Sequence, residues 1–518
     1  MADPDERSVH SETESEVKLG VPALFSMPQL TDLDGPHPLR ADPAGRLALK
    51  ATYYDTEDLR LARSGVTLRY RTGEGRPRWT LKLPAESAAE GERQELSVSA
   101  RPAAPPSELT ALVTALVRSA PLSEVVRLTT RREVWRLTDG AGQPVAELVD
   151  DLVSVVADSK VVARFRELEV ERHGIDEQAM TSLLSRLIDA GAIRGAFQPK
   201  LVRALGPRAT APTDIPAPLR IGKDDPASAL VAEALRAGVR RLLAQDVRVR
   251  LRREDAVHQM RVACRRLRSD MRTFGPLLAP DPAAAIRSEL SWLADALGAA
   301  RDLEVLRARL ATTLQADPLA PLDPVAFGRL DGLLMGREQA ALESVATALA
   351  EPRYVALLDN VVALAREPVT TVMADLPCRT VLPRLVGATV DDLDAKAAKL
   401  RRGAADRRWH AARIRAKRAR YAAEAAAGAL GARAAATGAA MAAVQDVLGN
   451  HQDAAIAADT VLTIAAQAPD DPALILLCGR LAERERSAVR AYRGQFAKVW
   501  KKANAAQARR WLTSGTRG

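Results

Sequence analysis

Several residue types and segments are scarce in this chain of 518 residues, and each scarcity excludes a class of protein. Phe, Trp and Tyr make up only 3% of the sequence, and this shortage beside abundant Ala and Leu favours helix over an all-β chain. The three cysteines are Cys264, Cys378 and Cys478; their odd number and wide spacing exclude a disulfide scaffold and a cysteine-based zinc site. No run of about 18 uncharged apolar residues occurs, so we expect no membrane partner.

Sequence motifs of several common enzyme classes are also missing. The chain has no Gly-x-x-x-x-Gly-Lys-Ser/Thr phosphate loop, no Gly-x-Ser-x-Gly elbow and no His-Glu-x-x-His zinc motif. Its start is acidic and polar, unlike a secretory signal, and we expect a cytoplasmic location. The 47% hydrophobic fraction is high enough to bury cores, which excludes a wholly disordered chain.

Positive charge is concentrated in the second part of the chain. Residues 1–222 hold 29 Lys and Arg against 32 Asp and Glu, whereas residues 223–518 hold 46 against 33. The overall formal charge of +10 therefore arises from the second part alone. A basic half joined to a near-neutral half predicts a polyanionic partner for one part of the protein.

The spacing of apolar residues changes near residue 205. Before it, short alternating segments separated by Gly, Pro or Asp predict antiparallel strands, with two helices between them, over 107–119 and 176–193. The predicted strands are 13–20, 46–56, 66–72, 78–83, 93–99, 128–138, 144–156 and 165–173. Eight strands with charges on one face predict a sheet closed into a β tunnel or barrel around a polar interior.

The rest of the chain predicts an all-α region. Residues 206–222 are rich in proline and read as a linker, and long Ala/Leu helices with 3.6-residue periodicity follow. The fold class is thus α+β multidomain. The predicted parts are a disordered tail (1–10), the tunnel domain (11–205), the linker (206–222), a helical domain (223–510) and a second tail (511–518).

The helical domain contains an internal repeat, over about 223–375 and 376–510. The block from His258 to Arg268 matches the block from His410 to Arg420. Leu297-Gly298 followed by Asp302 matches Leu448-Gly449 followed by Asp453 at nearly the same offset, and 333–337 resembles 476–480. The repeat predicts two pseudo-symmetric helical bundles.

Each of the two matching blocks predicts a helix with one basic face. The faces carry His258, Arg261, Arg265 and Arg268 in the first copy, and His410, Arg413, Lys417, Arg418 and Arg420 in the second. A solvated surface face usually mixes charges of both signs, because like charges one turn apart repel. A stacked basic face with a repeat of about 5.4 Å therefore favours a linear anion. Nucleic acid ranks second, because Asn, Gln and aromatic side chains for reading or stacking bases are missing.

These blocks resemble the CHAD family. The resemblance covers about residues 223–510 and rests on the His-x-x-Arg-Val/Ile-x-x-Arg/Lys-Arg-x-Arg pattern in both copies. It implies two pseudo-symmetric helical bundles that bind inorganic polyphosphate and do not catalyse a reaction.

Charged residues in the first half alternate along the predicted strands. Glu14, Glu16 and Lys18 share one face, as do Glu167, Glu169 and Glu171 near the end of the domain. Arg69 and Arg71, Arg78 and Lys82, and Arg93 and Glu95 share parities on the strands between them. Paired carboxylates suit hard divalent cations, and a charge-lined interior is costly unless ions and a ligand fill it.

The same motifs resemble the CYTH family of triphosphate tunnel metalloenzymes, over about residues 11–204. The ordered motifs are Glu14-x-Glu16-x-Lys18, Tyr54-Asp-Thr, Leu68-Arg69-Tyr-Arg71, Trp79-Thr-Leu-Lys82-Leu-Pro, Arg93-x-Glu95, Arg131-Arg132 and Glu167-x-Glu169-x-Glu171. The resemblance implies an eight-stranded tunnel that hydrolyses a triphosphate with Mg²⁺ or Mn²⁺ or, in some members, cyclises ATP. It places Glu14, Glu16, Glu167 and Glu169 around metal; Arg69, Arg71, Lys82 and Arg132 on phosphate; and Lys18 at the attacking or leaving oxygen.

Two adjacent pairs leave a choice open, because neighbours on a strand face opposite sides. We prefer Arg132 to Arg131 as the phosphate ligand and Asp150 to Asp151 as an additional metal ligand, and Glu171 is expected at the outer face. The leading hypothesis is a metal-dependent triphosphatase for inorganic triphosphate, or for a related organic triphosphate, with a polyphosphate-binding helical domain. The alternatives are a non-catalytic adaptor on polyphosphate granules and an adenylate cyclase.

Overall fold

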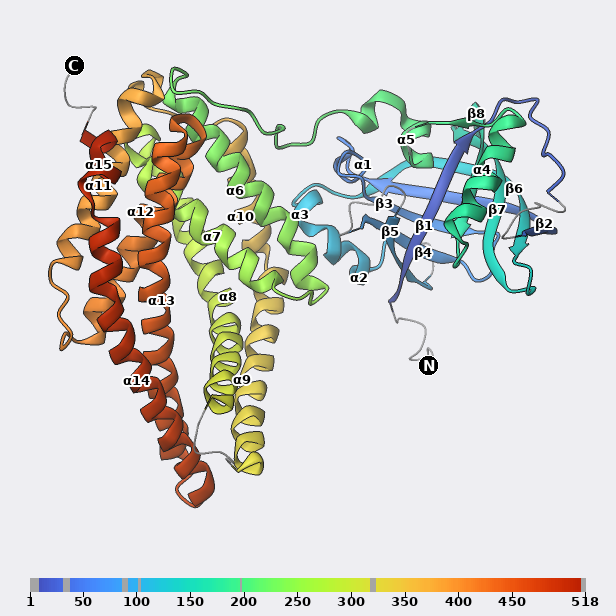
Figure 1. Cartoon of the computed structure of the whole chain (residues 1–518). Coiled ribbons are helices and arrows are strands. Elements are labelled where there is room, and N and C mark those ends of the chain that lie inside the picture. The colour runs from blue at the N-terminus through green and yellow to red at the C-terminus, as the bar shows by residue number, and fades with distance from the viewer. Residues whose placement is uncertain are drawn as a thin grey trace. The chain divides into compact units, whose positions relative to one another are not determined.

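The computed structural model describes residues 9–30, 38–85, 92–100, 104–195, 198–316 and 323–513. The chain forms two compact units, Met1–Asp214 and Ile215–Gly518 (Figure 1). Among the helices of the described ranges, none combines the length and the apolar character that a membrane crossing requires. Most residues of both predicted tails lie outside these ranges, but residues 511–513 belong to a helix and are not a tail.

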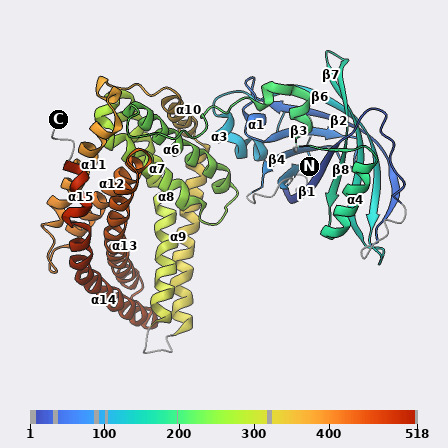
Figure 2. The same cartoon turned by 45° about the horizontal axis from the view of Figure 1, so that its top comes forward.

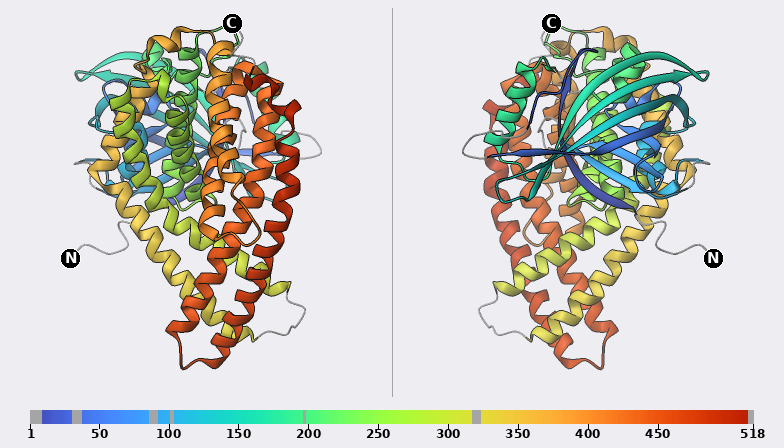
Figure 3. Two further views of the ribbon diagram at one scale, coloured as in Figure 1. Left: turned by 90° about the vertical axis from the view of Figure 1, so that its left-hand side faces the viewer. Right: turned by 90° about the vertical axis from the view of Figure 1, so that its right-hand side faces the viewer.

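Eight antiparallel strands of the first unit close into a ring, as predicted (Figure 3). Around the ring their order is β1-β5-β4-β3-β2-β6-β7-β8, and β8 pairs with β1 again. The strands are β1 (His10–Gly20), β2 (Arg40–Asp55), β3 (Thr67–Thr72), β4 (Arg78–Pro84), β5 (Glu92–Val98), β6 (Ser123–Thr138), β7 (Pro144–Ala157) and β8 (Lys160–Arg172). A ninth strand of two residues, β9 (Ile193–Arg194), pairs with the end of β1 and was not predicted.

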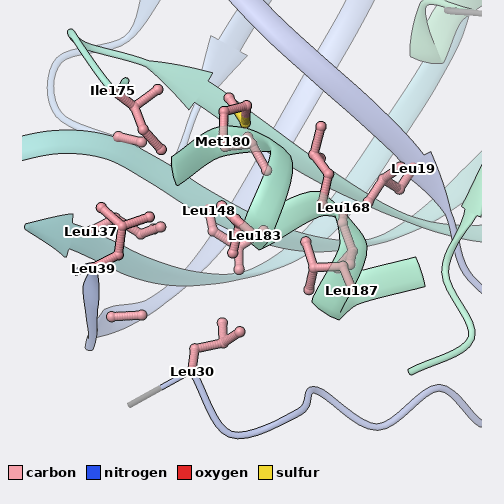
Figure 4. Close-up of a cluster of buried hydrophobic side chains, with 14 of the residues drawn as sticks. Leu19, Leu30, Leu39, Leu137, Leu148, Leu168, Ile175, Met180, Leu183 and Leu187 are labelled. Atoms are coloured by element: carbon pink, nitrogen blue, oxygen red, sulfur yellow. The ribbon is translucent and has the colours of Figure 1, made fainter. Parts of the chain in front are cut away.

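Strand alternation sends apolar side chains to the outside of the ring at the positions between the inward charges. Leu19, Leu148 and Leu168 lie on this outer face and are 0% exposed, because helix α4 (Glu177–Asp189) packs over them (Figure 4). Leu183 and Leu187 of that helix complete the contact. Burial of a leucine side chain contributes about 1.5–3 kcal/mol, so this outer layer holds the ring closed on that side.

The inside of the ring carries an apolar cluster at one end. There Val126, Leu128 and Val153 pack against Leu201 of helix α5 (Lys200–Leu205), which covers this end. The chain then forms the 3-10 helix Gly206–Thr210, whose Ala209 is buried in the same cluster. The first part of the segment predicted as a linker is therefore packed against the tunnel unit.

Short helices complete the first unit. The helix predicted over 107–119 is three short pieces, α2 (Ser107–Thr110), η2 (Ala111–Val113) and α3 (Thr114–Val117). One further turn, α1 (Arg60–Arg63), begins beside the buried carboxylate of Asp55, which accepts hydrogen bonds from the backbone N–H groups of Leu61 and Ala62 at 2.9 Å each.

The second unit is helical, and its helices follow the internal repeat. The first copy comprises α6 (Ala227–Arg250), α7 (Ala256–Thr273), α8 (Pro280–Gln315), α9 (Pro324–Ala350) and α10 (Pro352–Arg366). The second comprises α11 (Cys378–Ala397), α12 (Asp406–Leu430), α13 (Ala432–Gln467), α14 (Pro472–Ala503) and α15 (Ala506–Thr513). Pro226 and Pro377, the residues before α6 and α11, form a β-bridge with each other, so the two copies meet at equivalent points.

Long helix pairs extend from each copy (Figure 2). Helix α8 runs beside α9, and α13 runs beside α14. Their far ends share one core, in which Leu310 and Leu330 of the first copy pack with Val461 and Leu477 of the second. The two copies are therefore joined at these ends as well as at the bridge before α6 and α11.

A glycine in the turn between β3 and β4 permits a close approach to β2. Gly73 has a φ of 100°, and a Cβ atom there would lie 2.0 Å from the backbone oxygen of Ala48. We predict that Gly73→Ala lowers the free energy of unfolding by at least about 2 kcal/mol, because the strands must separate. Urea denaturation measures this change.

Gly75→Ala is the matched control for Gly73→Ala. Its φ is also positive, at 58°, but an added Cβ would meet none of the described atoms within 4 Å. If both variants lost the same stability, the cost would come from backbone conformation and not from the contact with Ala48.

Candidate functional site

The ring encloses a cavity of about 870 Å³ whose wall is mostly charged. Strand register brings opposite charges together, since Lys18 on β1 lies opposite Glu169 on β8, and Lys82 on β4 lies opposite Glu95 on β5. The sequence-predicted residues in this wall are Glu14, Glu16, Lys18, Arg69, Arg71, Lys82, Arg132 and Glu169. The ring therefore gathers cations and carboxylates from most of its strands into one space.

Two buried lysines occupy the carboxylate-rich part of the cavity. The Lys18 ammonium is bonded to Glu169 and lies 3.3 Å from Glu16. The Lys200 ammonium lies 2.8 Å from Glu169, 2.8 Å from Asp151 and 3.3 Å from Glu167. Each ammonium is thus held between at least two carboxylates.

These contacts shift the pKa values of neighbouring carboxyl groups in opposite directions. Burial alone would raise the pKa of Glu169, but Lys18 and Lys200 outweigh it and hold the pKa well below its usual range. For Glu16, burial outweighs the attraction of Lys18 and raises the pKa. Glu169 is therefore a permanent anion at neutral pH, whereas Glu16 takes up a proton more readily.

The choices left open by adjacent residues are decided by strand direction. Arg132 points inward and binds Asp151 through two hydrogen bonds of 2.9 and 2.8 Å, while Arg131 is exposed. Asp150 instead binds Arg166 through bonds of 2.8 and 2.6 Å, and neither Asp150 nor the buried Asp151 belongs to the described lining of the cavity. The expected inward position of Asp150 is corrected, because Asp151 and not Asp150 shares the inward parity of its register partners Arg132 and Glu167.

The position expected for Glu171 is also corrected. Its side chain lines the cavity, where burial and the charge of Glu14 raise its pKa. Glu171 has the same strand parity as Glu167 and Glu169, so the alternation along β8 predicts that all three side chains share one face.

Arginines line another part of the cavity. The Arg69 guanidinium lies 3.5 Å from the hydroxyl of Tyr53, its partner across β2 and β3. Arg71 pairs with Glu74 at 2.6 Å, and burial together with the charge of Arg69 lowers its pKa to about 10. Cations held this close repel one another in the free protein, and a bound polyanion would relieve that repulsion.

Sequence reasoning missed several residues of this wall. Lys200 comes from α5, outside the strand pattern, and only its proximity in space reveals it. Tyr53 directly precedes the Tyr54-Asp-Thr motif, and Glu95 belongs to the Arg93-x-Glu95 motif, so both had a signal that was not used.

The carboxylate oxygens of the ring are the type of donor that binds a hard divalent cation. Within the described ranges, no three Asp, Glu, His or Cys side chains lie close enough to hold a metal as they stand. The reason is that Lys18 and Lys200 lie between the carboxylates. One oxygen of Glu167, Oε1, is buried without a hydrogen bond, although ammonium groups lie 3.3 and 3.9 Å away. Oxygen donors of this kind are those that Mg²⁺ and Mn²⁺ prefer.

The helical unit carries a second candidate site, a basic groove of about 670 Å³ between the two copies. Its lining from α7 and α12 includes Arg261, Arg265, Arg268, Arg272, Arg413, Arg415, Lys417 and Arg418. Among the described lining residues there is no Asp or Glu. The opposite side of α7 is buried through Met260, Cys264, Leu267 and Met271, as its periodicity predicts.

A smaller cavity of about 430 Å³ adjoins the groove and shares part of its wall. Arg261, Arg265, Arg413 and Lys417 line both spaces, whereas Asp302, Asp446 and Asp453 line only the smaller, mixed cavity. Burial, followed by the charges of Arg413 and Arg265, lowers the pKa of Lys417 to about 7. This lysine is therefore partly neutral at physiological pH.

Not every residue of the predicted basic faces reaches these spaces. His258 lines the mixed cavity, but its counterpart His410 is exposed near the start of α12 and lines neither space. Arg420 binds Glu424 at 2.6 Å and also lies outside both. Arg418 lines the groove and lies 3.2 Å from Asp392.

Family comparisons identify both halves of the chain. The family model of the CYTH domain matches residues 12–191, and that of the CHAD domain matches residues 233–462. The chain therefore carries a CYTH domain followed by a CHAD domain, which confirms the two resemblances in its motifs. CYTH domains depend on metal.

Individual relatives cover parts of the chain. An uncharacterized protein of Mycobacterium tuberculosis H37Rv is 37% identical over 349 residues, which are 64% of this chain and 66% of the relative. PptA from Streptomyces chartreusis is 26% identical over 54% of this chain and all of that structure, with a TM-score of 0.46. The CHAD domain from the plant Ricinus communis is 29% identical over 57% of this chain and 97% of that structure, with a TM-score of 0.41.

The corrected carboxylate can be tested by metal titration. We predict that Asp151→Asn weakens Mn²⁺ binding at least about tenfold, because an inward carboxylate is lost, whereas Asp150→Asn leaves it unchanged. Calorimetric titration measures the affinities, and thermal unfolding shows that both variants are folded. Equal weakening by both substitutions would contradict the assignment.

Proposed function

We propose that the tunnel unit hydrolyses inorganic triphosphate with Mg²⁺ or Mn²⁺ as cofactor. The observation that carries the proposal is the cavity wall, in which arginines and lysines face a group of acidic side chains inside one ring. A phosphate chain together with a divalent cation complements both kinds of charge. The bound cation would supply Lewis-acid polarisation of a phosphoryl oxygen.

The cationic side chains of the ring hold and stabilise the phosphate chain in this proposal. Arg69, Arg71, Lys82 and Arg132 neutralise the oxygens of the phosphoryl group as water attacks phosphorus and the anhydride P–O bond breaks. The products are orthophosphate and pyrophosphate. Lys18 neutralises the charge on the attacking or leaving oxygen. Fixed charges of this kind supply most of what a protein can contribute to phosphoryl transfer.

The cavity wall favours an inorganic substrate over a nucleotide. Tyr53 is the only Phe, Trp or Tyr side chain in the described part of the wall, and its ring packs into the apolar cluster at the covered end. A base or a thiazolium ring would therefore find no exposed aromatic face on which to stack. Inorganic triphosphate is accordingly the first candidate, with thiamine triphosphate and ATP as comparison substrates.

Substitution of two adjacent arginines tests the proposed activity. We predict that Arg132→Ala lowers kcat/KM for triphosphate at least about 100-fold, because an inward cation is lost, while Arg131→Ala stays near wild type. Phosphate release with Mg²⁺ or Mn²⁺ measures the rates. Glu16→Ala should also abolish turnover without unfolding the chain.

The products identify what the tunnel does if the proposal fails. Wild-type protein that hydrolyses none of the three triphosphates would contradict the enzyme and favour a binding adaptor. Formation of cyclic AMP and pyrophosphate from ATP would instead show a cyclase.

We further propose that the helical unit binds inorganic polyphosphate. The supporting observation is the groove between α7 and α12, whose described lining is rich in arginine and free of carboxylates. Side chains that recur along these helices at about 5.4 Å meet successive phosphates of one chain, so that several weak contacts add within a single ligand. DNA of matched charge is the comparison ligand.

The acidity of Lys417 predicts a pH dependence for this binding. Its pKa of about 7 leaves it charged below that pH and neutral above it. A bound polyanion favours the charged form, so affinity for long-chain polyphosphate should fall about tenfold from about pH 6 to about pH 8. Lys417→Arg should remove most of this fall, and calorimetry at low salt measures both proteins.

Two further measurements separate the site from general attraction. Replacement of Arg261, Arg265, Arg413 and Lys417 together by Ala should remove most binding while helicity is kept, since Ala favours helix. Unchanged affinity in this variant would contradict the site, and equal affinity for DNA would contradict its preference for polyphosphate.

A further inference from the structure

A repeated Gly-x-x-x-Asp motif on α8 and α13 lies at the mixed cavity and has no part in the functions proposed so far. In each copy a glycine is followed four residues later by an aspartate, as Gly298 and Asp302 on α8 and as Gly449 and Asp453 on α13. Four residues are about one turn of helix, so the glycine and the aspartate share one side of it. The motif on α8 lies next to the basic helix α7, and the motif on α13 lies next to the basic helix α12.

The glycines leave room for an arginine to lie along the helix. A Cβ atom on Gly298 would be 3.4 Å from Nη2 of Arg261, and one on Gly449 would be 3.9 Å from Nε of Arg413. Both distances are those of van der Waals contact, so each arginine side chain packs directly against the backbone at its glycine. The same arrangement occurs in both copies.

The aspartates meet the guanidinium groups one turn further on. Asp302 accepts a hydrogen bond of 2.6 Å from Arg261 Nη1, and Asp453 lies 3.9 Å from Arg413 Nη2. Both aspartates line the mixed cavity and neither lines the basic groove, whereas both arginines line the two spaces. The arginines therefore stand between an acidic partner on one side and the groove on the other.

We propose that Asp302 and Asp453 are built-in counter-ions that compete with the polyanion for Arg261 and Arg413. This inference rests on the proposed binding of polyphosphate by the helical unit. In the ligand-free protein the aspartates offset part of the repulsion among Arg261, Arg265, Arg413 and Lys417, which have few other anions near them. A phosphate in the groove has to draw the same guanidinium groups away from them.

Competition and a purely structural role predict different changes in polyphosphate affinity when the aspartate is removed. An aspartate that only positioned its arginine would, when lost, weaken binding or leave it unchanged. An aspartate that competes for the arginine would, when lost, strengthen binding. The surroundings make this test feasible, because the side chains of Asp302 and Asp453 are 59% and 34% exposed and a neutral isostere leaves no deeply buried charge.

The test is the affinity of the full chain for long-chain polyphosphate at low salt, measured by calorimetry. We expect the double variant Asp302→Asn/Asp453→Asn to bind about three- to tenfold more tightly than wild type, from the energies typical of two partly exposed ion pairs. The gain should shrink as salt is added, since screening weakens the aspartates and the phosphates alike.

A matched double variant controls for the change in net charge. Asp331→Asn/Asp459→Asn also removes two carboxylates that bind arginines of a neighbouring helix, Arg307 and Arg486, but neither residue lines the groove or the mixed cavity. We expect its affinity to stay within about twofold of wild type, because the lost charges are remote from the site.

Each outcome separates this inference from the function on which it rests. Tighter binding by the first double variant alone supports the counter-ions. Unchanged or weaker binding by it, with wild-type binding intact, overturns them and leaves polyphosphate binding in place. Equal tightening by both double variants also overturns them in favour of net charge. Absence of binding by wild type overturns the proposed function and this inference together.

Discussion

Charged side chains that point into the ring must be paired there with side chains of opposite charge. Much of the structure of the first unit follows from this requirement. Strand pairing supplies these partners directly. Lys18 lies opposite Glu169 on the neighbouring strand, and Arg132 lies opposite Asp151. Lys200 is held by three carboxylates of neighbouring strands, which ties α5 to the ring. An uncompensated charge in such a place would cost several kcal/mol, so the ion pairs and the fold depend on each other.

The helical unit meets the same requirement less completely. Arg265 and Lys417, at equivalent positions of the two copies, lie in one wall with Arg261 and Arg413, and the acidic groups nearby are fewer than the cations. Burial, followed by the charges of Arg413 and Arg265, lowers the pKa of Lys417 to about 7, so part of this shift reflects that imbalance. A site that is poorly compensated when empty gains more from a bound anion than one whose charges are already paired.

Strand and helix periodicity were enough to predict the ring, the two bundles and most inward residues. Alternation fixes which residues share a face, but it does not say which face of a strand is inside, so the pattern alone cannot decide between Asp150 and Asp151. Lys200 could not be found in this way, because a helix that covers the end of a ring has no register with its strands. His410 shows the converse limit, since an exact match between repeats did not place it where His258 lies.

The covered end of the ring determines how solutes enter and leave the cavity. Apolar side chains and α5 occupy one end, so exchange with bulk water takes place away from it. A molecule held next to Lys200 is then the innermost occupant, and anything that entered after it has to leave first. Under the proposed hydrolysis, turnover would therefore be sensitive to the concentration of product outside, because a product that re-enters would hold back the one behind it.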